Sequence, residues 1–398
     1  MEIAQVQPAF NPFRPGAGVR PPELVGRQSE VDFVNLMIAK SMQRRNDGGL
    51  IMYGLRGVGK TVLLNELQQL VGRAGWVTVQ LEARPGQSGR LAVRQSLGRG
   101  IAMAGRQMAR FRSAVEEVKT AISTISAFSF TVAGVSMNLG VDRSDHRANS
   151  GLLEVDLEEL VADLAEPLRK NNSALAIFVD EMQDLDVDLL TALLAVQHRA
   201  VQSDWPFFII GAGLSTLRRT LAEARSYAER FTIREVRALP DEEARAAVRN
   251  PATALGAKIS DDALEAILGE AQGYPFFLQT FGKAVWDIAP DRNIDREIAV
   301  AGIAEGNADL DQSFFPARWD RTTPGERQYL RAMVDVGGGD MASTSAIAEQ
   351  LGTAATSLSP VRQSLIEKGI IYAERRGYVS FTVPNMDRFI RRQADTDE

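Results

Sequence analysis

The sequence predicts an α/β protein built on a parallel sheet, followed by a helical segment and a small carboxyl-terminal domain. Three observations predict it. An apolar strand pattern at 48–54 runs into a glycine-rich loop and then into an amphipathic helix pattern at 61–71. Further apolar strands are separated by helical patterns, which favours parallel strands joined by helices. One of these strands, at 173–185, carries two adjacent acids where its apolar run ends.

Composition sets limits on the class of protein. The chain has 398 residues, enough for two or three domains, and no cysteine, which excludes disulfides and thiolate metal sites. His146 and His198 lack metal-ligand spacing. No apolar run of about 18 residues suggests a membrane span, and the first residues lack the order of a signal peptide. We therefore expect a soluble, cytoplasmic protein with no membrane contact. The net charge of −6 means that any nucleic-acid contact needs a local basic patch.

The core elements are predicted in chain order. Residues 1–23 are rich in proline and glycine and are expected to form an irregular arm, and a helix is expected at 28–44. The continuous apolar character of the strand patterns is typical of buried parallel strands. The predicted strands are 48–54, 76–83, 173–185, 205–213 and 230–239.

A segment at about 98–150 is expected to be an insertion in this core. Apolar residues alternate with small or polar ones at 128–132 and again at 135–141, with Ala133 and Gly134 between the two runs. This alternation predicts a hairpin with a two-residue turn. The hairpin could be packing decoration, or it could contact a partner or a neighbouring subunit.

The loop GLRGVGKT, at 54–61, meets the pattern G-x-x-x-x-G-K-[ST]. Its glycines let the backbone aim amide N–H groups at phosphate oxygens, and the helix that follows adds its positive end. Lys60 can reach the β and γ phosphates, and the Thr61 hydroxyl can bind Mg²⁺. We therefore expect ATP or ADP with Mg²⁺ as cofactors. The predicted cofactor-binding residues of the loop are Gly54, Leu55, Arg56, Gly57, Val58, Gly59, Lys60, Thr61 and Val62.

Two acids complete the predicted catalytic site. Asp180 would hold Mg²⁺ through its water shell, and Glu181 would polarise the water that attacks the γ-phosphate. Charge on the transferred phosphoryl oxygens would be stabilised by Lys60, Mg²⁺ and one more cation. Arg230, just before a predicted strand, is a candidate for that cation if a neighbouring subunit supplies it. The alternative for Arg230 is an ordinary surface salt bridge.

Together these residues resemble the AAA+ ATPases, in the branch of the origin-recognition and cell-division-control initiators and the prokaryotic ATPases that border the STAND signalling class. GLRGVGKT and FVDEMQDL look like Walker A and Walker B, which implies that Glu181 activates water. LVGRQSEV, at 24–31, looks like the GR-x-x-E box that lies against adenine. This last likeness implies that Val25, Gly26 and Arg27 contact the base.

The resemblance also indicates residues of the sensor and lid regions. FFIIGAGLS looks like the sensor 1 strand, with Ser215 as a weak candidate for the polar sensor, and Arg230 matches the place of the trans-acting arginine finger. GYPFFLQ, at 273–279, resembles the GxP element of the STAND-like lid, which implies that Pro275 borders the nucleotide. A sensor 2 arginine, usual in initiators, is missing from 273–283.

The end of the chain resembles a winged helix-turn-helix. Helices are predicted at 326–338, 343–352 and 359–371, followed by a basic hairpin at 371–384. In DNA-binding examples the third helix enters the major groove and the wing contacts the backbone. Basic and acidic residues are nearly balanced here, so a protein-contact role is the alternative. The candidate DNA contacts are Thr356, Ser357, Arg362, Gln363, Arg375 and Arg376.

The predicted organisation is a P-loop ATPase core at 1–236, a helical lid at 237–315 and a winged helix-turn-helix at 319–392. The expected function is an ATP-binding, slowly hydrolysing switch that couples nucleotide state to association with double-stranded DNA or to homo-oligomer assembly. The alternatives are a STAND-like signalling ATPase with a protein partner and a scaffold that does not hydrolyse ATP.

Overall fold

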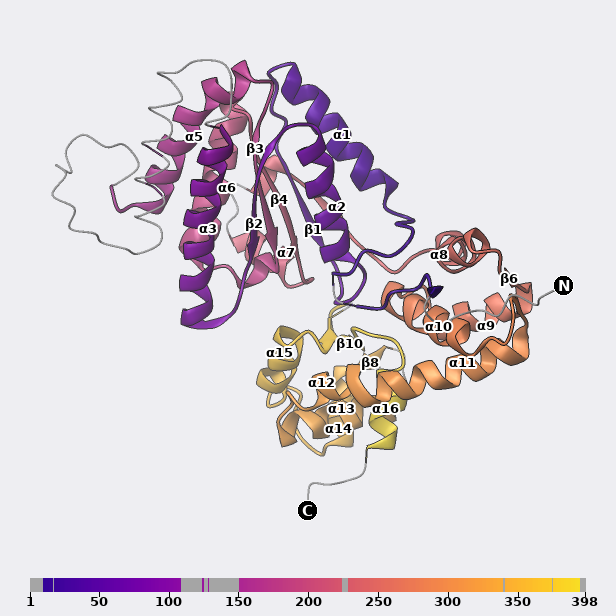
Figure 1. Ribbon diagram of the computed structural model, residues 1–398. Helices are drawn as coiled ribbons and strands as arrows, with labels where there is room; N and C mark the ends of the chain where they lie inside the picture. The colour runs from indigo at the N-terminus through magenta and orange to yellow at the C-terminus, as the bar shows by residue number, and fades with distance from the viewer. Residues whose placement is uncertain are drawn as a thin grey trace. The chain divides into compact units, whose positions relative to one another are not determined.

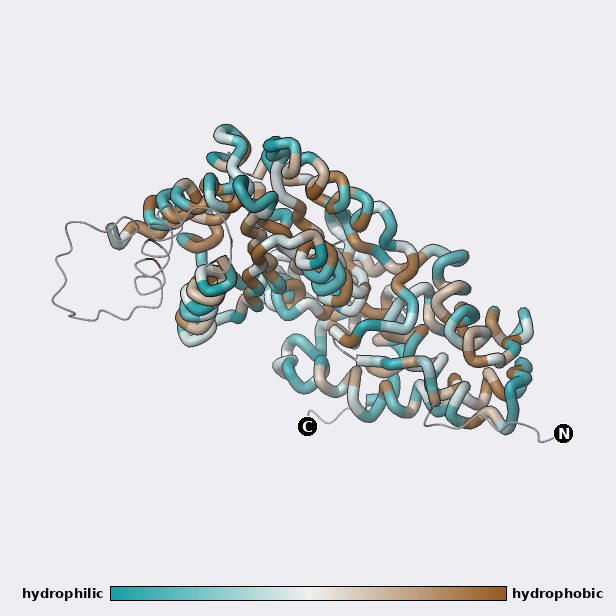
Figure 2. The backbone as a smooth tube through the Cα atoms, turned by 45° about the horizontal axis from the view of Figure 1, so that its top comes forward, coloured by the Kyte–Doolittle hydropathy of each residue, from teal (hydrophilic) through white to brown (hydrophobic). Residues whose placement is uncertain are grey.

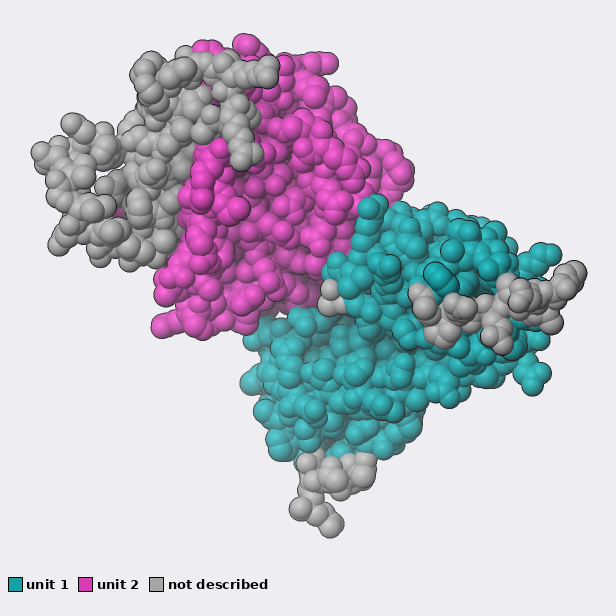
Figure 3. Space-filling model, viewed as in Figure 1, with its two compact units in different colours: residues 1–26, 55–59, 236–398 teal, residues 27–54, 60–235 magenta. Residues whose placement is uncertain are grey.

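The chain divides into two compact units (Figure 3). One, the core unit, comprises residues 27–54 and 60–235, and the other, the carboxyl-terminal unit, comprises 1–26, 55–59 and 236–398. Elements carry the labels of Figure 1. The computed structural model describes residues 10–16, 18–108, 124, 128, 150–223, 228–338, 341–373 and 375–393.

The core unit is built on a five-stranded parallel sheet with the strand order β2-β3-β4-β1-β5. The α/β class with a parallel sheet is therefore confirmed, and each predicted strand segment contains one of the five strands. β4 lies between β1, which leads into the glycine-rich loop, and β3, which ends in the acids. The strands are β1 (Gly49–Tyr53), β2 (Val77–Glu82), β3 (Leu175–Asp180), β4 (Phe207–Gly213) and β5 (Phe231–Glu235).

Helices cover both faces of this sheet (Figure 1), and the strands between them are strongly apolar (Figure 2). On β3 alternate side chains face opposite ways. Leu175, Ile177 and Val179 join a buried cluster with one set of helices, whereas Phe178 and Asp180 face the other set. The first set is α3 (Gly86–Met108), α5 (Leu153–Lys170) and α6 (Val187–Gln202), and the second is α1 (Gln28–Met42) and α2 (Lys60–Arg73).

Two short elements follow inner strands: η2 (Met182–Asp184) after β3 and α7 (Leu217–Glu223) after β4. A third, η3 (Ala228–Arg230), precedes the edge strand β5. Within the described ranges, every helix is too short or too polar to traverse a lipid bilayer.

The predicted insertion begins inside a regular helix, because α3 continues to Met108. Of the predicted hairpin, only Phe128 is described. It is helical rather than extended and is fully buried in the core cluster, so the strand prediction is wrong at this position. A short run of alternating apolar residues is compatible with a helix or a strand. At Phe128 the chain is helical, and the conformation is the one that buries the aromatic ring in the core cluster. The remaining hairpin residues lie outside the described part of the chain.

The first part of the carboxyl-terminal unit is helical. Two of its helices have side-chain caps: Ser260 accepts a hydrogen bond from the Ala263 amide, and Asp295 accepts one from the Ile298 amide. Pro275 starts α10, where its fixed φ suits the first turn. The elements are α8 (Asp241–Ala254), β6 (Lys258–Ile259), α9 (Asp261–Ala271), α10 (Pro275–Ile288), β7 (Asn293–Ile294) and α11 (Arg296–Asp309).

The amino-terminal arm packs on α10. Phe13 is 3% exposed and meets Trp286 edge-on at a centroid distance of 6.5 Å. A Cβ at Gly282 would lie 2.7 Å from the Phe13 ring, so only glycine leaves room for this aromatic. The Asn11 side-chain amide donates to the Lys283 carbonyl at 3.0 Å. From residue 10 onward, the described part of the arm is thus largely irregular, as expected, but it packs into the helical core.

The chain ends in a small antiparallel sheet of order β8-β10-β9 with helices around it. The sequence predicts the three helices and the two strands of the hairpin in this segment but not β8, which lies between the first and second helices, and the assignment as a winged helix stays a prediction. Its elements are η4 (Leu310–Phe314), α12 (Pro316–Trp319), α13 (Pro324–Gly337), β8 (Ala342–Ser343), α14 (Thr344–Gln350), α15 (Ser359–Glu367), β9 (Ile371–Tyr372), β10 (Tyr378–Phe381) and α16 (Met386–Arg392).

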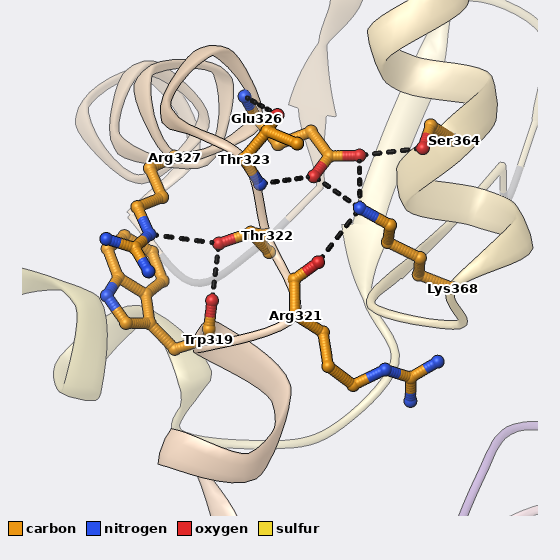
Figure 4. A network of polar contacts seen from close by, with 8 residues as sticks. All are labelled: Trp319, Arg321, Thr322, Thr323, Glu326, Arg327, Ser364 and Lys368. Atoms are coloured by element: carbon orange, nitrogen blue, oxygen red, sulfur yellow. Dashed lines mark hydrogen bonds and ion pairs between the residues drawn. The ribbon is translucent and has the colours of Figure 1, made fainter.

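A buried carboxylate ties α13 to α15 (Figure 4). Glu326 is 3% exposed, forms a capping box with Thr323, and accepts hydrogen bonds from Ser364 at 2.7 Å and from Lys368 at 2.6 and 2.8 Å. Lys368 also donates to the Arg321 carbonyl. These charge-assisted hydrogen bonds hold α13 and α15 together, because a buried charge without its partner would be costly.

Candidate nucleotide-binding site

The phosphate loop joins β1 to α2, and the two acids lie at the end of β3, with Asp180 as its last residue and Glu181 just after it. Because parallel strands present their carboxyl ends at one edge of a sheet, this edge collects the loop and the acids. Gly57 and Gly59 have φ values of +86° and +94°, in the left-handed region that side-chain-bearing residues avoid. The backbone of the loop therefore requires glycine at position 59, which belongs to the pattern, and at position 57, which the pattern leaves open.

Lys60 begins α2 and is buried, with 6% of its surface exposed. Its ammonium donates to the Gly54 carbonyl at 3.2 Å. The lysine therefore folds back over the start of the loop, where an anion would meet both its charge and the positive end of α2.

Thr61 and Asp180 lie side by side. The Thr61 hydroxyl donates to Asp180 Oδ2 at 2.7 Å. Burial raises the pKa of Asp180, against hydrogen bonds from Thr61 and from the Glu181 amide that lower it. Both groups offer oxygen, the donor that Mg²⁺ prefers, and Mg²⁺ is commonly held by one or two protein oxygens plus phosphates and water. The pair therefore fits Mg²⁺, and the described residues contain no cluster of three or more acids or histidines suited to a metal.

Glu181 takes an unusual backbone conformation. Its φ is +50°, in the left-handed region, and its amide donates to Asp180 Oδ1 at 2.9 Å. Non-glycine residues with this conformation are uncommon and concentrate at functional sites. The left-handed turn directs the chain from β3 into η2.

Sequence reasoning missed Gln183. Its side-chain amide donates to Glu181 Oε2 at 2.9 Å and to Asp184 Oδ2 at 3.1 Å, and its oxygen accepts from the Leu214 amide, just beyond β4, at 2.9 Å. The signal was available in FVDEMQDL, as a polar residue two positions after the predicted catalytic acid.

Ser215 lies half-buried in the turn before α7. Glu181 is linked to the segment after β4 by Gln183 instead: Gln183 donates to Glu181 and accepts a hydrogen bond from the Leu214 amide. Ser215 as a sensor therefore stays a prediction without a supporting contact.

Arg230 lies at the opposite edge of the sheet from Lys60 and Asp180. It precedes Phe231, which pairs with Gly49 at the amino end of β1. At about 3.3 Å per residue, the length of β1 places Arg230 roughly 16 Å from the phosphate loop. Arg230 is exposed, and its Nε donates to His198 Nδ1 at 3.3 Å. Only a neighbouring subunit could bring such an arginine to the nucleotide.

In the carboxyl-terminal unit, Tyr274 contacts the phosphate loop itself. Its hydroxyl donates to the Arg56 carbonyl, and a Cβ at Gly57 would clash with the phenol. Tyr274 is 2% exposed, and burial raises its pKa. Pro275, the next residue, is half-buried at the start of α10. The GYP element therefore contains a direct partner for the loop.

The box predicted to lie against adenine has structural roles in each unit. Gly26 has a φ of +67° and leaves room for the side chains of Leu239 and Glu243. In the core unit, Arg27 is buried, and the buried Glu30 pairs with Arg234 of β5 at 3.7 Å. Base contact by Val25, Gly26 and Arg27 stays a prediction.

The candidate DNA contacts differ in how far they are already engaged. Thr356 and Ser357 are exposed in the turn before α15, and Arg376 is exposed in the loop between β9 and β10. Gln363 donates to Glu367 on the same helix, and Arg375 stacks on the Tyr378 ring at 4.1 Å. Arg362 is half-buried on α15. Basic side chains suited to phosphate contact are therefore few on α15 and gather at the β9–β10 loop.

Comparisons with known proteins agree with this geometry. Residues 23–210 match the family described as the AAA ATPase domain, which supports the resemblance to AAA+ ATPases for that part of the chain. Residues 312–390 match a domain of unknown function, DUF8462. No curated protein matches the sequence significantly.

One solved structure extends the similarity in fold to nearly the whole chain. A Walker-type ATPase of Pyrococcus abyssi superposes with a TM-score of 0.59 at 16% identity, covering 96% of this chain and 99% of that one. The Orc1 protein of Aeropyrum pernix, solved in complex with DNA, gives a TM-score of 0.46 at 16% identity over 93% of each chain. The first similarity confirms the P-loop α/β fold.

Proposed function

We propose that this protein binds ATP with Mg²⁺ and hydrolyses it slowly, as a switch that couples nucleotide state to DNA association or to assembly of its own subunits. The observation that carries the proposal is the hydrogen bond between Thr61 and Asp180 beside the buried Lys60. A hydroxyl, a carboxylate and an ammonium at the edge of a parallel sheet form the donor set for a magnesium-bound triphosphate.

Each residue has a separate task in this chemistry. Lys60 holds the β and γ phosphates, and Thr61 and Asp180 hold the metal, which neutralises charge on the phosphate oxygens when bound. Glu181 orients the attacking water and accepts its proton. Because these groups are fixed before the reaction, catalysis requires little reorganisation.

Two variants test binding and hydrolysis separately. Lys60→Ala should abolish the heat of ATP binding in calorimetry, whereas Glu181→Gln should bind ATP normally and lose hydrolysis by at least about 100-fold. Lys40→Ala, at a half-buried lysine of α1 that pairs with Asp47, is the control and should behave as the unchanged protein in both assays. ATP binding that survives Lys60→Ala would remove the proposal.

DNA association is tested through the β9–β10 loop. Arg375→Ala combined with Arg376→Ala should weaken binding to double-stranded DNA and flatten its dependence on salt, by about 0.9 in log–log slope for each lost phosphate contact. Arg388→Ala, an exposed arginine of α16 paired with Glu270, is the control. If neither the unchanged protein nor the Arg388→Ala control binds double-stranded DNA at low salt, with or without ATP, DNA association is excluded as the output of the switch.

A protein-contact role for the last domain is the second candidate. The observation that favours it is the engagement of Lys368 with the buried Glu326, which leaves Arg362 as the basic side chain within α15. In this STAND-like alternative the nucleotide switch presents the domain to a protein. Nucleotide that co-purifies with monomers in the absence of any DNA affinity is the result expected from it.

A further inference from the structure

One peptide group at the end of β4 joins the phosphate loop to Glu181. The Gly213 carbonyl accepts a hydrogen bond from the Gly54 amide at 3.2 Å, and Gly54 is the residue whose own carbonyl holds Lys60. The amide of the same peptide group, that of Leu214, donates to Gln183 Oε1 at 2.9 Å. The start of the loop and Gln183 are therefore hydrogen-bonded to the two sides of a single planar peptide group.

The donors and acceptors around Gln183 fix the orientation of its side-chain amide. Its NH₂ group has two donors, and these meet the carboxylates of Glu181 and Asp184 at 2.9 and 3.1 Å. Its oxygen meets a backbone N–H. The reversed amide would set oxygen against two carboxylates and NH₂ against N–H, so only this orientation satisfies every group.

The sequence of β4 makes room for this bridge. A Cβ at Gly213 would lie 2.6 Å from Gln183 Oε1, and a Cβ at Gly211 would collide with the sulfur of Met182. Both glycines of the GAG run thus face the η2 turn. The positive φ of Glu181 completes the arrangement, because it turns the chain so that Gln183 comes back beside the Glu181 carboxylate.

We propose that Gln183 is a positioning residue for Glu181, and that its amide fixes the catalytic carboxylate relative to the end of β4 and so to the phosphate loop. This inference rests on the proposed ATP hydrolysis. The side-chain hydrogen bonds of Gln183 go to Glu181, Asp184 and the Leu214 amide. Its part is to hold Glu181 where a water can be aimed at the γ-phosphate.

The test separates turnover from binding in the full-length protein. Gln183→Leu, close in size but unable to hydrogen-bond, should lower kcat for MgATP about 10- to 100-fold, since misplacing a reacting group by about 1 Å has effects of this size. The Kd for ATP from calorimetry should change by less than about twofold, because Lys60 and Thr61 are untouched. Gln183→Glu should be at least as slow, because a third carboxylate cannot donate to Glu181 or Asp184.

Non-additivity distinguishes positioning from a general structural role. In a Glu181→Ala background, adding Gln183→Leu should lower the residual hydrolysis by less than about twofold, because the group that it positions is already gone. Gly213→Ala, whose Cβ would press on Gln183 Oε1 and on the Leu217 side chain while the Gln183 amide is kept, should reproduce the loss in kcat and serves if Gln183→Leu folds poorly. Gln69→Leu, an exposed glutamine on α2, is the matched control.

The outcomes separate this inference from the proposed function. Normal turnover in both Gln183→Leu and Gly213→Ala, or a drop that adds fully to that of Glu181→Ala, overturns the positioning role and leaves ATP hydrolysis standing. Absence of hydrolysis in the unchanged protein overturns both.

Discussion

Lys368 shows how one residue can change meaning between sequence and structure. In the sequence it is a basic residue at the end of a candidate DNA-contacting helix. In the structure its ammonium is 2.6 Å from the buried Glu326 and also donates to the Arg321 carbonyl. Its charge serves the packing of α13 against α15.

We predict that Lys368→Met destabilises the carboxyl-terminal unit by about 2 kcal/mol at pH 7, because it leaves a buried carboxylate without its main partner. Lys283→Met removes an exposed ion pair with Asp287 and should cost less than about 0.5 kcal/mol. Urea unfolding of both variants measures the difference, and equal effects would contradict the assigned role of Lys368.

The same site predicts a pH dependence. Burial alone would raise the pKa of Glu326, but hydrogen bonds from Lys368, Ser364 and the Thr323 amide outweigh it and lower the pKa from its ordinary value of 4.5. The stabilisation is therefore present above the pKa of the unfolded chain and is lost as pH falls through the lower folded value. The stability gap between Lys368→Met and the unchanged protein should narrow below about pH 4, as denaturation curves at several pH values would show.

At the scale of elements, two turns carry the site, and the contacts that hold them could not be predicted from the sequence. The loop after β1 receives a hydrogen bond from Tyr274 at the start of α10, and the η2 turn after β3 is tied to the end of β4 by Gln183. Each contact joins residues that are remote in sequence. Such contacts depend on how the elements pack, which local patterns do not determine.

We predict that Tyr274→Phe weakens ATP binding about 3- to 10-fold, because it removes one hydrogen bond that holds the phosphate loop, worth about 1 kcal/mol. Tyr329→Phe is the matched control: the Tyr329 hydroxyl is buried with no hydrogen-bond partner among the described residues, so its removal should leave ATP affinity unchanged. Calorimetry of ATP binding to both variants measures the two affinities. Equal affinities for the two would show that the loop does not depend on the phenol.

Much of the core could be predicted from sequence because its signals are local. The loop pattern, the apolar strands and the acids after β3 each lie within a dozen residues. The strand expected at Phe128 failed because alternation over a few residues is ambiguous until burial is known. Gln183 was missed as a site residue, and the contact of Tyr274 with the phosphate loop was not predicted, because their partners, Leu214 and Arg56, are supplied by other elements of the fold.

At the scale of the whole molecule, the position of Arg230 bears on assembly. Arg230 lies at the amino edge of the sheet, whereas Lys60 and Asp180 lie at the carboxyl edge. A subunit therefore cannot apply its own Arg230 to its own nucleotide without unfolding β5. If this arginine serves hydrolysis, the active form contains more than one subunit.

We predict that ATP turnover per subunit rises with protein concentration and that Arg230→Ala suppresses the rise. Mixing Arg230→Ala with Glu181→Gln should restore turnover, because the second variant supplies the arginine and the first supplies the intact site. Arg199→Ala, an exposed arginine on α6 paired with Glu158, is the control. Turnover that is independent of concentration and of Arg230 would assign this arginine to the surface alone.

The seating of Phe13 over Gly282 has a practical consequence for anyone who trims or tags this chain. A shortened protein that begins after Phe13 would lose the ring that covers Gly282 and Trp286. Water would then contact the backbone at Gly282 and the Trp286 side chain. Truncation at the amino end therefore removes a buried core residue, and a fusion partner is better attached before the arm than in place of it.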